Sequence, residues 1–110
     1  MARGEHLGEF ELIVLAAVLR AGSDAYGVVI HREIEERTRR RVAIGSVYKA
    51  LERLRRKGLV ERRLGDPTPV RGGRAKQLFE VTRAGRRAMR RTVETFDRMF
   101  EGLELGLDSA

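Results

Sequence analysis

Apolar residues along the chain fall in segments whose spacing predicts three helices, two strands and a fourth helix. In residues 7–20, apolar side chains occupy nearly the whole circumference of the predicted helix, although a surface helix needs only one apolar stripe. A small domain can cover only one side of such a helix, so we expect the other side to contact a partner. Gly22 is suited to ending this helix, and Asp24 to capping the next one.

The next two segments predict a pair of helices joined by a short basic connection. Residues 25–39 are amphipathic, and their apolar positions recur every four residues: Tyr26, Ile30 and Ile34. A third helix is predicted from Ser46, a favourable N-cap, to Lys57, with Gly58 ending it. Its expected buried row is Ile44, Val47, Leu51 and Leu54.

The remaining segments predict a β-hairpin and a long helix. Residues 59–64 and 76–81 are predicted strands, and the prolines and glycines of residues 65–75 are typical of an exposed hairpin tip. Thr82 caps the last helix, where apolar residues alternate four- and three-residue steps, a pattern that keeps one seam against a neighbouring helix. The seam residues are Met89, Val93, Phe96, Phe100 and Leu103.

This order of elements predicts a mainly α protein with a β-hairpin wing, a winged helix-turn-helix. We expect a DNA-binding domain in residues 1–81, a dimerisation helix in residues 82–104 and a tail in residues 105–110. In such a fold the second helix of the helix-turn-helix enters the major groove of DNA. The fold class therefore directs attention to the exposed side of the third helix.

Composition narrows the class of partner. The 110 residues carry 23 Lys and Arg against 16 Asp and Glu, a formal net charge of +7 and a pI near 10.9, which favours a polyanion. The longest apolar run, residues 12–19, is shorter than the roughly 20 residues that span a bilayer. The chain has no cysteine, which excludes disulfides and thiolate sites. We therefore expect a cytoplasmic protein that does not bind membranes.

Neither catalysis nor metal binding is indicated by the sequence. His6 and His31 belong to no metal-ligand spacing, which favours a structural or solvated role for both. No nucleophile with a paired base can be named. We expect no enzyme activity and no cofactor.

Basic side chains gather on the predicted outer face of the third helix: Lys49, Arg53 and Arg56, with Tyr48 and Glu52 at the flanks. Lysine and arginine there can reach guanine acceptors, and Tyr48 can donate to a phosphate. Ser46 and its neighbouring backbone amides can hold another phosphate. A solvated charged face is the alternative, but the helix-turn-helix context favours DNA.

A second basic set lies on the predicted wing: Arg62, Arg63, Arg71, Arg74 and Lys76. Gly72 and Gly73 would let the backbone lie close to a duplex or enter its minor groove. We expect contacts with phosphates that do not depend on base sequence. The alternatives are an Arg-Gly-Gly RNA-binding segment and an ordinary polar turn.

Two further basic runs have more than one interpretation. Residues 39–41 either hold the DNA backbone or complement the dipole of the helix that they follow. Five arginines open the last helix, where positive charge is unfavourable to the dipole, which favours a use against phosphate. They are Arg83, Arg86, Arg87, Arg90 and Arg91.

Several short fragments occur in an order and spacing that are specific together: Leu7–Glu11, Ala25–Gly27, Gly45–Tyr48, Leu51 with Leu54, Lys57–Val60, Arg71–Arg74 and Val81–Gly85. In this combination the chain resembles the PadR family over nearly its whole length. The single helix after the wing resembles the smaller PadR subgroup, whose members dimerise through that helix and the first one.

The resemblance implies a bacterial repressor that binds a pseudo-palindromic promoter site and is released by a small effector, often aromatic or hydrophobic. Some small members hold flat drugs between tryptophans at the dimer centre, and this chain has no tryptophan. Phe96 and Phe100 are the candidates to replace that platform, with core packing as the alternative.

We therefore expect a homodimer that binds double-stranded DNA and regulates transcription. The residues expected at the dimer contact are Phe10, Val14, Met89, Val93, Phe96, Phe100 and Leu103. An RNA-binding or architectural nucleic-acid protein and a protein-binding adaptor are the alternatives from other classes.

Overall fold

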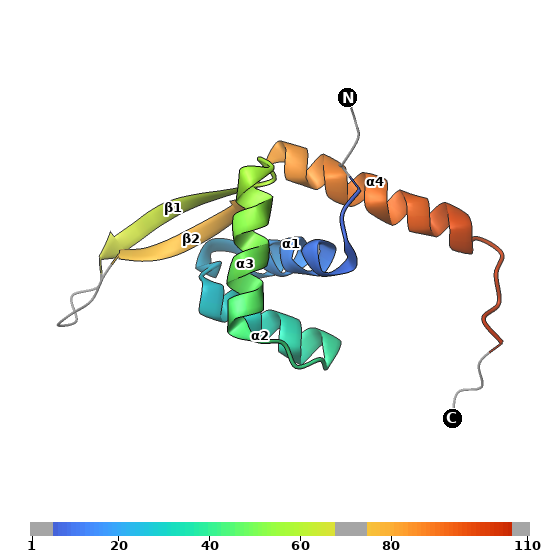
Figure 1. The fold of residues 1–110 in the computed structure, drawn as a ribbon, viewed down its shortest axis with the longest axis horizontal. Helices are drawn as coiled ribbons and strands as arrows, with labels where there is room; N and C mark the ends of the chain where they lie inside the picture. The colour runs from blue at the N-terminus through green and yellow to red at the C-terminus, as the bar shows by residue number, and fades with distance from the viewer. Residues whose placement is uncertain (1–5, 68–74, 107–110) are drawn as a thin grey trace.

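The computed structural model describes residues 6–67 and 75–106, which form four α-helices and one β-hairpin (Figure 1). In chain order these are α1 (Glu9–Ala21), a 3-10 turn (Gly22–Asp24), α2 (Gly27–Thr38), α3 (Ile44–Arg56), β1 (Val60–Pro67), β2 (Ala75–Val81) and α4 (Arg83–Phe100). This confirms the expected helical fold with an antiparallel hairpin. Helices α2 and α3 form the helix-turn-helix, and the hairpin is the wing.

The hydrophobic core lies where α1, α2 and α3 meet the base of the hairpin. Leu15, Ile30 and Leu54 are completely buried there, and burying a side chain of this size stabilises the fold by about 1.5–3 kcal/mol. Val14, which the sequence placed at the dimer contact, is also completely buried. It is a core residue of the single chain and is inaccessible to a partner.

The two central helices begin at other residues than the sequence suggested. Ala25 and Tyr26 pair with β2, since the Phe79 N–H donates to the Ala25 carbonyl at 3.0 Å and Tyr26 forms a bridge with Leu78. Helix α2 starts only after this pairing, at Gly27, so Asp24 lies in the 3-10 turn and does not cap it.

Helix α3, in contrast to α2, starts before its expected cap. The backbone leaves the extended conformation after Ala43, which is the N-cap, so Ser46 lies inside the first turn. Ile44 is the first helical residue and remains 40% exposed, whereas we expected it to be buried. The rest of the buried row, Val47, Leu51 and Leu54, is confirmed.

The end of α3 is fixed by Gly58, whose φ of 77° is suited to glycine. The Leu59 N–H donates to the Leu54 carbonyl at 2.9 Å, and the Gly58 N–H to the Arg55 carbonyl at 3.0 Å. These two bonds are a Schellman motif, which satisfies the last carbonyls of the helix. The buried side chains of Leu54 and Leu59 accompany it. The chain therefore turns directly from α3 into the wing.

Helix α4 is attached to the end of α3 at its own first turn. The Thr82 hydroxyl accepts from the Gly85 N–H at 3.0 Å and donates to the Gly58 carbonyl at 2.8 Å, which confirms Thr82 as the N-cap. A Cβ at Gly85 would overlap the Leu59 carbonyl oxygen. Only glycine allows α4 to approach the start of β1 this closely.

The second half of α4 extends away from the body of the chain (Figure 1). The radius of gyration is 16.2 Å, against about 13 Å for a compact domain of this length. The buried residues of α4, Gly85, Ala88 and Thr92, all lie in its first half and middle. From Val93 onward, the helix has no other described element covering its apolar side chains.

Candidate nucleic-acid interface

The N-termini of α2 and α3 lie close to each other beside the wing. Tyr48 of α3 packs over Gly27, where a Cβ would overlap its phenol ring. Around them lies an open cavity of about 600 Å³, lined by Tyr26, Gly27, Val28, Val29, Tyr48 and Gln77. Gly27 and Gln77 were not among the residues predicted for a nucleic-acid interface. Gly27 does belong to Ala25–Gly27, one of the fragments that carry the family resemblance.

Both helix N-termini are free of acidic side chains in their first turns, in contrast to α1, which has Glu9 and Glu11 there. The positive end of the helix dipole is therefore not neutralised locally in α2 or α3. Gly45 and Ser46 in the first turn of α3 are exposed, and no atom lies within 4 Å of the position of a Cβ on Gly45. This is an arrangement that binds phosphate readily.

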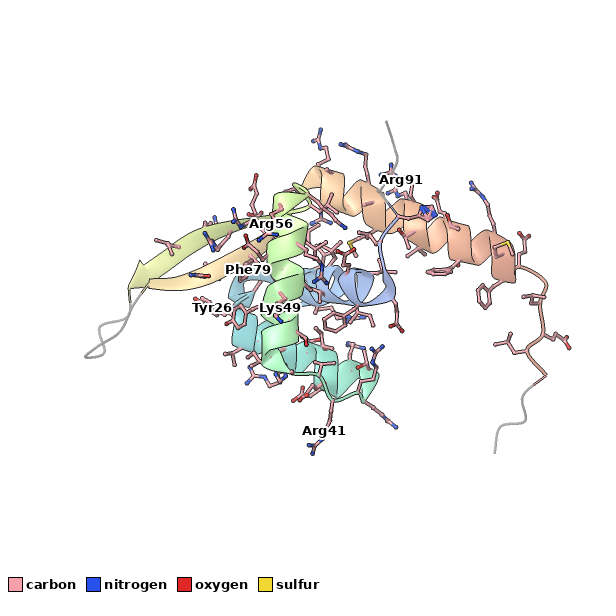
Figure 2. All side chains as sticks on the ribbon, viewed as in Figure 1. Tyr26, Arg41, Lys49, Arg56, Phe79 and Arg91 are labelled. Carbon is pink, nitrogen blue, oxygen red and sulfur yellow. The ribbon has the colours of Figure 1, made fainter. Side chains whose placement is uncertain are left out.

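The outward side of α3 carries Lys49 and Arg56 (Figure 2). Glu52 lies between them and binds Arg55 through two hydrogen bonds, at 2.7 and 3.2 Å. The hydrogen bond from Arg55 is the main reason why the pKa of Glu52 is lowered. Because Glu52 is neutralised by Arg55 and lies 3.6 Å from Arg56, the net charge of this side of α3 is positive.

Arg53 is directed differently from its predicted neighbours. Its Nε donates to Glu11 of α1 at 3.4 Å, and the Lys57 ammonium donates to the same carboxylate at 3.1 Å. The Glu11 side chain is only 10% exposed, whereas that of Arg53 is 50% exposed. Arg53 therefore links α3 to α1, and only half of its side chain is exposed.

Glu11 stays charged because of these partners. Burial raises its pKa, but hydrogen bonds from Lys57 and the Gly8 N–H, the charge of Lys57 and the hydrogen bond from Arg53 together lower it below 4.5. A buried carboxylate without such partners would be costly. The ionised Glu11 thus holds the first turn of α1 against the end of α3.

The turn between α2 and α3 is fixed by polar side chains. The Glu35 carboxylate accepts from the Val42 N–H at 3.0 Å, and His31 Nε2 lies 2.8 Å from the Val42 carbonyl oxygen. Arg39 ends α2 in the left-handed conformation, and Arg40 pairs with Glu9 at 3.1 Å. All three arginines of the basic run 39–41 are exposed, and Arg41 lies at the edge of the molecule (Figure 2).

The wing places Arg62 beside α3. Arg62 pairs with Phe79 across the hairpin and so shares its face, and its charge acts on Glu52. Arg63 pairs with Leu78 on the other face. The tip residues Arg71, Gly72, Gly73 and Arg74 and the side chain of Lys76 lie outside the described residues.

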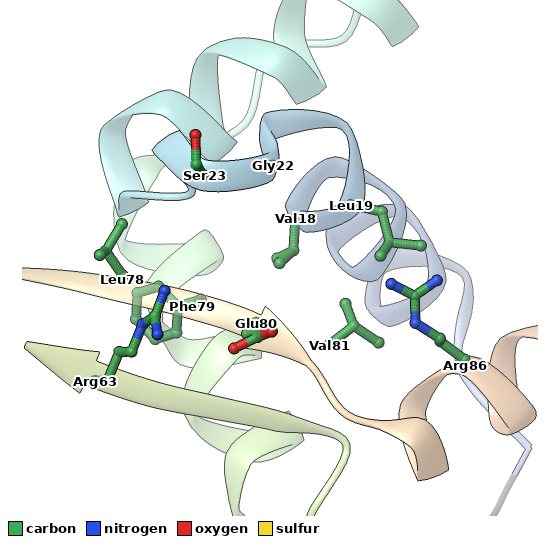
Figure 3. A pocket seen from close by; sticks show the side chains of 10 residues that line it. All are labelled: Val18, Leu19, Gly22, Ser23, Arg63, Leu78, Phe79, Glu80, Val81 and Arg86. Carbon is green, nitrogen blue, oxygen red and sulfur yellow. The ribbon is translucent and has the colours of Figure 1, made fainter. Parts of the chain in front are cut away.

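A shallow cavity of about 320 Å³ lies behind the wing, between the end of α1 and the start of α4 (Figure 3). Val18, Leu19 and Val81 supply apolar walls. Arg63 and Arg86 stand on opposite sides of it (Figure 3). The cavity therefore has apolar walls and two cationic side chains. None of the residues that line it belongs to α3.

The side chains expected at a dimer contact are mostly accessible. Val93, Phe96, Phe100 and Leu103 are 44–59% exposed, and the rings of Phe96 and Phe100 contact edge to face, with centroids 6.3 Å apart. Phe10 and Met89 are partly buried against the core. Leu103 lies beyond the end of α4 at Phe100, so the helix is shorter than its seam suggested.

Comparison with known sequences identifies the family. The profile of the PadR-like transcriptional regulator family matches residues 14–91, which include the helix-turn-helix, the wing and the first half of α4. The chain belongs to this family. No curated protein matches this sequence significantly.

Solved structures of PadR-type and related regulators share the fold. RosR of H. salinarum is 28% identical, with a TM-score of 0.69 over 94% of this chain and 84% of that chain. A PadR-like transcription factor from Bacteroides fragilis is 20% identical, with a TM-score of 0.68 over 84% of both chains. BpsR of Bordetella bronchiseptica, whose DNA binding is regulated by 6-hydroxynicotinic acid, is 22% identical, with a TM-score of 0.66 over 93% of this chain and 71% of that chain.

These matches confirm the resemblance and the winged-helix fold. In residues 6–67 and 75–106, no helix is long and apolar enough to cross a bilayer. The same residues contain no cluster of three or more histidine, cysteine, aspartate or glutamate side chains that could hold a metal ion.

Proposed function

We propose that this PadR-family regulator is a repressor that binds a pseudo-palindromic promoter site as a homodimer and is not an enzyme. The observation that carries the proposal is the combination of an exposed basic side of α3 with two helix N-termini that lack acidic residues. Arginine and lysine in the major groove read guanine edges, while helix N-termini bind the phosphates alongside. Both functions are available on one face of the fold.

The contacts of the predicted DNA-binding residues suggest a different role for each of them. Lys49 and Arg56 are placed to reach base edges or phosphates from the outward side of α3. Tyr48 lies against Gly27 beside the open cavity at the start of α2, and we propose that it donates to a phosphate. Arg62 extends the same basic surface onto the wing, and the tip residues 71–74 are proposed to contact phosphates or the minor groove.

The direct test is binding to the intergenic region upstream of the gene that encodes this chain. We expect Lys49→Ala to weaken binding to that fragment by about 1–3 kcal/mol in fluorescence anisotropy at fixed salt. Arg37→Ala is the matched control, since Arg37 pairs with Glu33 on α2 and binding should be unchanged. Equal affinity of the Lys49 variant and the parent would exclude Lys49 from the interface.

Competition separates the proposal from the other classes. A sequence-specific regulator keeps the promoter fragment in the presence of excess unrelated DNA and RNA. An RNA-binding protein would exchange onto RNA, and an architectural protein onto unrelated duplex. Failure to bind any nucleic acid would leave the adaptor alternative.

The homodimer is proposed to form through α1 and α4, which expose more apolar surface than the single chain covers. Residues of the two helices that would share this contact are Phe10, Met89, Val93, Phe96, Phe100 and Leu103. Two copies would present two recognition helices to the two half-sites of a pseudo-palindrome. A monomer at micromolar concentration in light scattering would contradict this assembly.

Release by a small effector is the remaining part of the proposal. The cavity behind the wing supplies apolar walls and the guanidinium of Arg63, which suits a small aromatic acid. With 6-hydroxynicotinic acid as the probe, we expect a concentration-dependent rise in melting temperature that is lost in Arg63→Ala. The alternative platform, Phe96 with Phe100, predicts that Phe100→Ala removes the response instead. No response in the parent would reject this class of effector.

A further inference from the structure

Helix α4 is bonded to the rest of the chain at two points along its length. The first is its opening turn, where the Thr82 hydroxyl donates to the Gly58 carbonyl at 2.8 Å. The second is Thr92, whose hydroxyl oxygen accepts from the Leu7 N–H at 3.4 Å. The helix rises about 15 Å between Thr82 and Thr92. A helix held at one end can pivot, whereas a second contact this far along the axis fixes its direction.

Thr92 is unusual among the side chains of α4. Of the residues that the structure describes, two polar ones are buried, Thr92 and Glu11. The Thr92 hydroxyl donates to the Ala88 carbonyl at 2.9 Å, so its oxygen is still able to accept the Leu7 N–H. A buried N–H that loses its acceptor is costly. The contact between α4 and the N-terminal segment therefore depends on this hydroxyl group.

The N-terminal segment that holds α4 also holds the end of α3. The Gly8 N–H donates to the Glu11 carboxylate at 3.3 Å. The same carboxylate accepts from Arg53 at 3.4 Å and from Lys57 at 3.1 Å. Residues 7–11 are thus hydrogen-bonded to α4 on one side and to the end of α3 on the other. They connect the two helices at a distance from the opening turn of α4.

The angle between α3 and α4 has a consequence for DNA binding. In the proposed homodimer, α4 contacts the partner and α3 reads one half-site, so this angle sets the distance between the two copies of α3. Half-sites are spaced by one turn of DNA, about 34–36 Å, or by a multiple of it. A change of about 3.4 Å in that distance corresponds to one base pair. A pivot of α4 would therefore alter the half-site spacing that fits.

We propose that Thr92 fixes the direction of α4 relative to α3 and so determines which spacing of half-sites this regulator accepts. The inference rests on the proposed homodimer and its DNA binding, and it names a residue that sets their geometry. Thr92 is 3% exposed, so it cannot read DNA itself. It is a positioning residue that acts through the N-terminal segment.

Three variants separate the hydroxyl from the packing of the side chain. Thr92→Val removes the hydroxyl and keeps the branched shape, whereas Thr92→Ser keeps the hydroxyl. Thr95→Val is the matched control, because the Thr95 hydroxyl makes the same bond within the helix, to the Arg91 carbonyl at 2.9 Å, and Thr95 is not buried. Circular dichroism and urea unfolding record helix content and stability for every protein.

The direction of α4 is measured on the protein without DNA. The chain has no cysteine, so Glu36→Cys on α2 and Arg98→Cys on α4 add two spin labels at exposed positions. Electron–electron resonance on protein diluted with unlabelled chain gives the distance within one copy. We expect a narrow distribution in the parent, Thr92→Ser and Thr95→Val. In Thr92→Val the distribution should be about twofold broader, because the second point of attachment is lost.

A series of promoter fragments with base pairs inserted between the half-sites tests the spacing. One inserted pair should weaken binding of the parent, Thr92→Ser and Thr95→Val by about tenfold or more. Thr92→Val should bind the natural spacing about three- to tenfold more weakly than the parent, and the inserted pair should cost it less than about threefold. Binding to a single half-site should be unchanged in all of them. Loss of stability alone would weaken binding to every fragment alike.

Several results would overturn the proposal: a broad distance distribution in the parent, equal widths in the parent and Thr92→Val, an equal spacing penalty in both, or a Thr92→Ser variant that behaves like Thr92→Val. The distance measurement does not depend on DNA. A protein that ignores promoter DNA but shows the expected broadening would reject the proposed function and keep the role of Thr92 in fixing α4. A protein that binds the promoter without any broadening would do the reverse.

Discussion

At the scale of single residues, Glu11 connects α1, the proposed dimer contact, to the end of α3, the proposed DNA-binding helix. It lies in the first turn of α1, which is proposed to contact a partner, and it binds Arg53 of α3 and Lys57, the residue that follows α3. The sequence placed Arg53 among the base-reading residues, while the structure shows that its Nε is bound to a nearly buried carboxylate. Changes at Glu11 are therefore expected to affect stability first and DNA binding second.

We expect Glu11→Gln to lower the free energy of unfolding by about 1–3 kcal/mol at pH 7, because two cations lose a buried charged partner. Glu9→Gln on the same turn is the control and should change it by less than about 0.5 kcal/mol, since Glu9 is mostly exposed. Urea unfolding followed by circular dichroism measures both. A loss for Glu9→Gln as large as that for Glu11→Gln would contradict this role of Glu11.

The same carboxylate predicts a pH dependence. Its pKa in the folded chain is lowered from the ordinary value of 4.5, so its stabilising contribution is complete above 4.5 and is lost as pH falls through the lower, folded value. We expect the parent to lose stability between about pH 5 and 3 more steeply than Glu11→Gln. Parallel pH profiles of the two proteins would show that Glu11 is not the group responsible.

At the scale of elements, two close contacts between backbone and neighbouring groups fix how the elements are arranged. Tyr48 packs over Gly27 and so holds the N-termini of α2 and α3 together, and α4 packs against the start of β1. The second depends on Gly85, whose added methyl group would meet the Leu59 carbonyl oxygen and, at 2.7 Å, Val81. Backbone atoms cannot move aside as a flexible side chain can. The position of α4, and with it any dimer, follows from this contact.

Gly85→Ala is expected to destabilise the chain by about 1–3 kcal/mol despite the better helix propensity of alanine. Gly45→Ala is the matched control, since a Cβ there meets nothing within 4 Å, and alanine in an open helical position should be neutral or stabilise by up to about 1 kcal/mol. Denaturant midpoints at equal m-values give both numbers. Equal stability of the Gly85 variant and the parent would mean that α4 can shift without cost.

The wing carries the second prediction at this scale. Replacing Arg71 and Arg74 together by alanine should lower affinity for promoter and unrelated duplex alike, and should reduce the slope of log affinity against log salt by about one for each lost phosphate contact. Arg98→Ala, on the last turns of α4 far from the wing, controls for the loss of positive charge. An unchanged slope in the double variant would place the wing tip away from DNA.

At the scale of the whole molecule, stability, dimerisation and DNA binding are expected to be coupled through α4. Its second half projects from the body and exposes Phe96 and Phe100 to about half of their full surface. Most of the stability of a helix in a protein comes from packing of its apolar side, so a partner that covers this side should stabilise the second half of α4. Loss of the partner should therefore also loosen the helix.

Phe96→Asp tests this coupling. We expect a monomer, a partly unfolded α4 or both, and a fall in promoter affinity because one copy engages only one half-site. Arg98→Asp, two residues away on the outward side, should remain dimeric with nearly full affinity. Size-exclusion chromatography with light scattering gives the oligomeric state, and fluorescence anisotropy on the same samples gives the promoter affinity. A dimeric Phe96→Asp variant with full affinity would reject a dimer built through α4.

The sequence alone determined the order of the elements, the wing, the Thr82 cap and the family, because these depend on local periodicity, turn residues and short-range spacing. The tertiary structure decided the rest. It moved the start of α2 from Ala25 to Gly27, because Ala25 and Tyr26 pair with a strand some fifty residues away. It turned Arg53 toward Glu11 and buried Val14, because the direction of a helix face depends on which neighbour packs against it, and no local pattern contains that information.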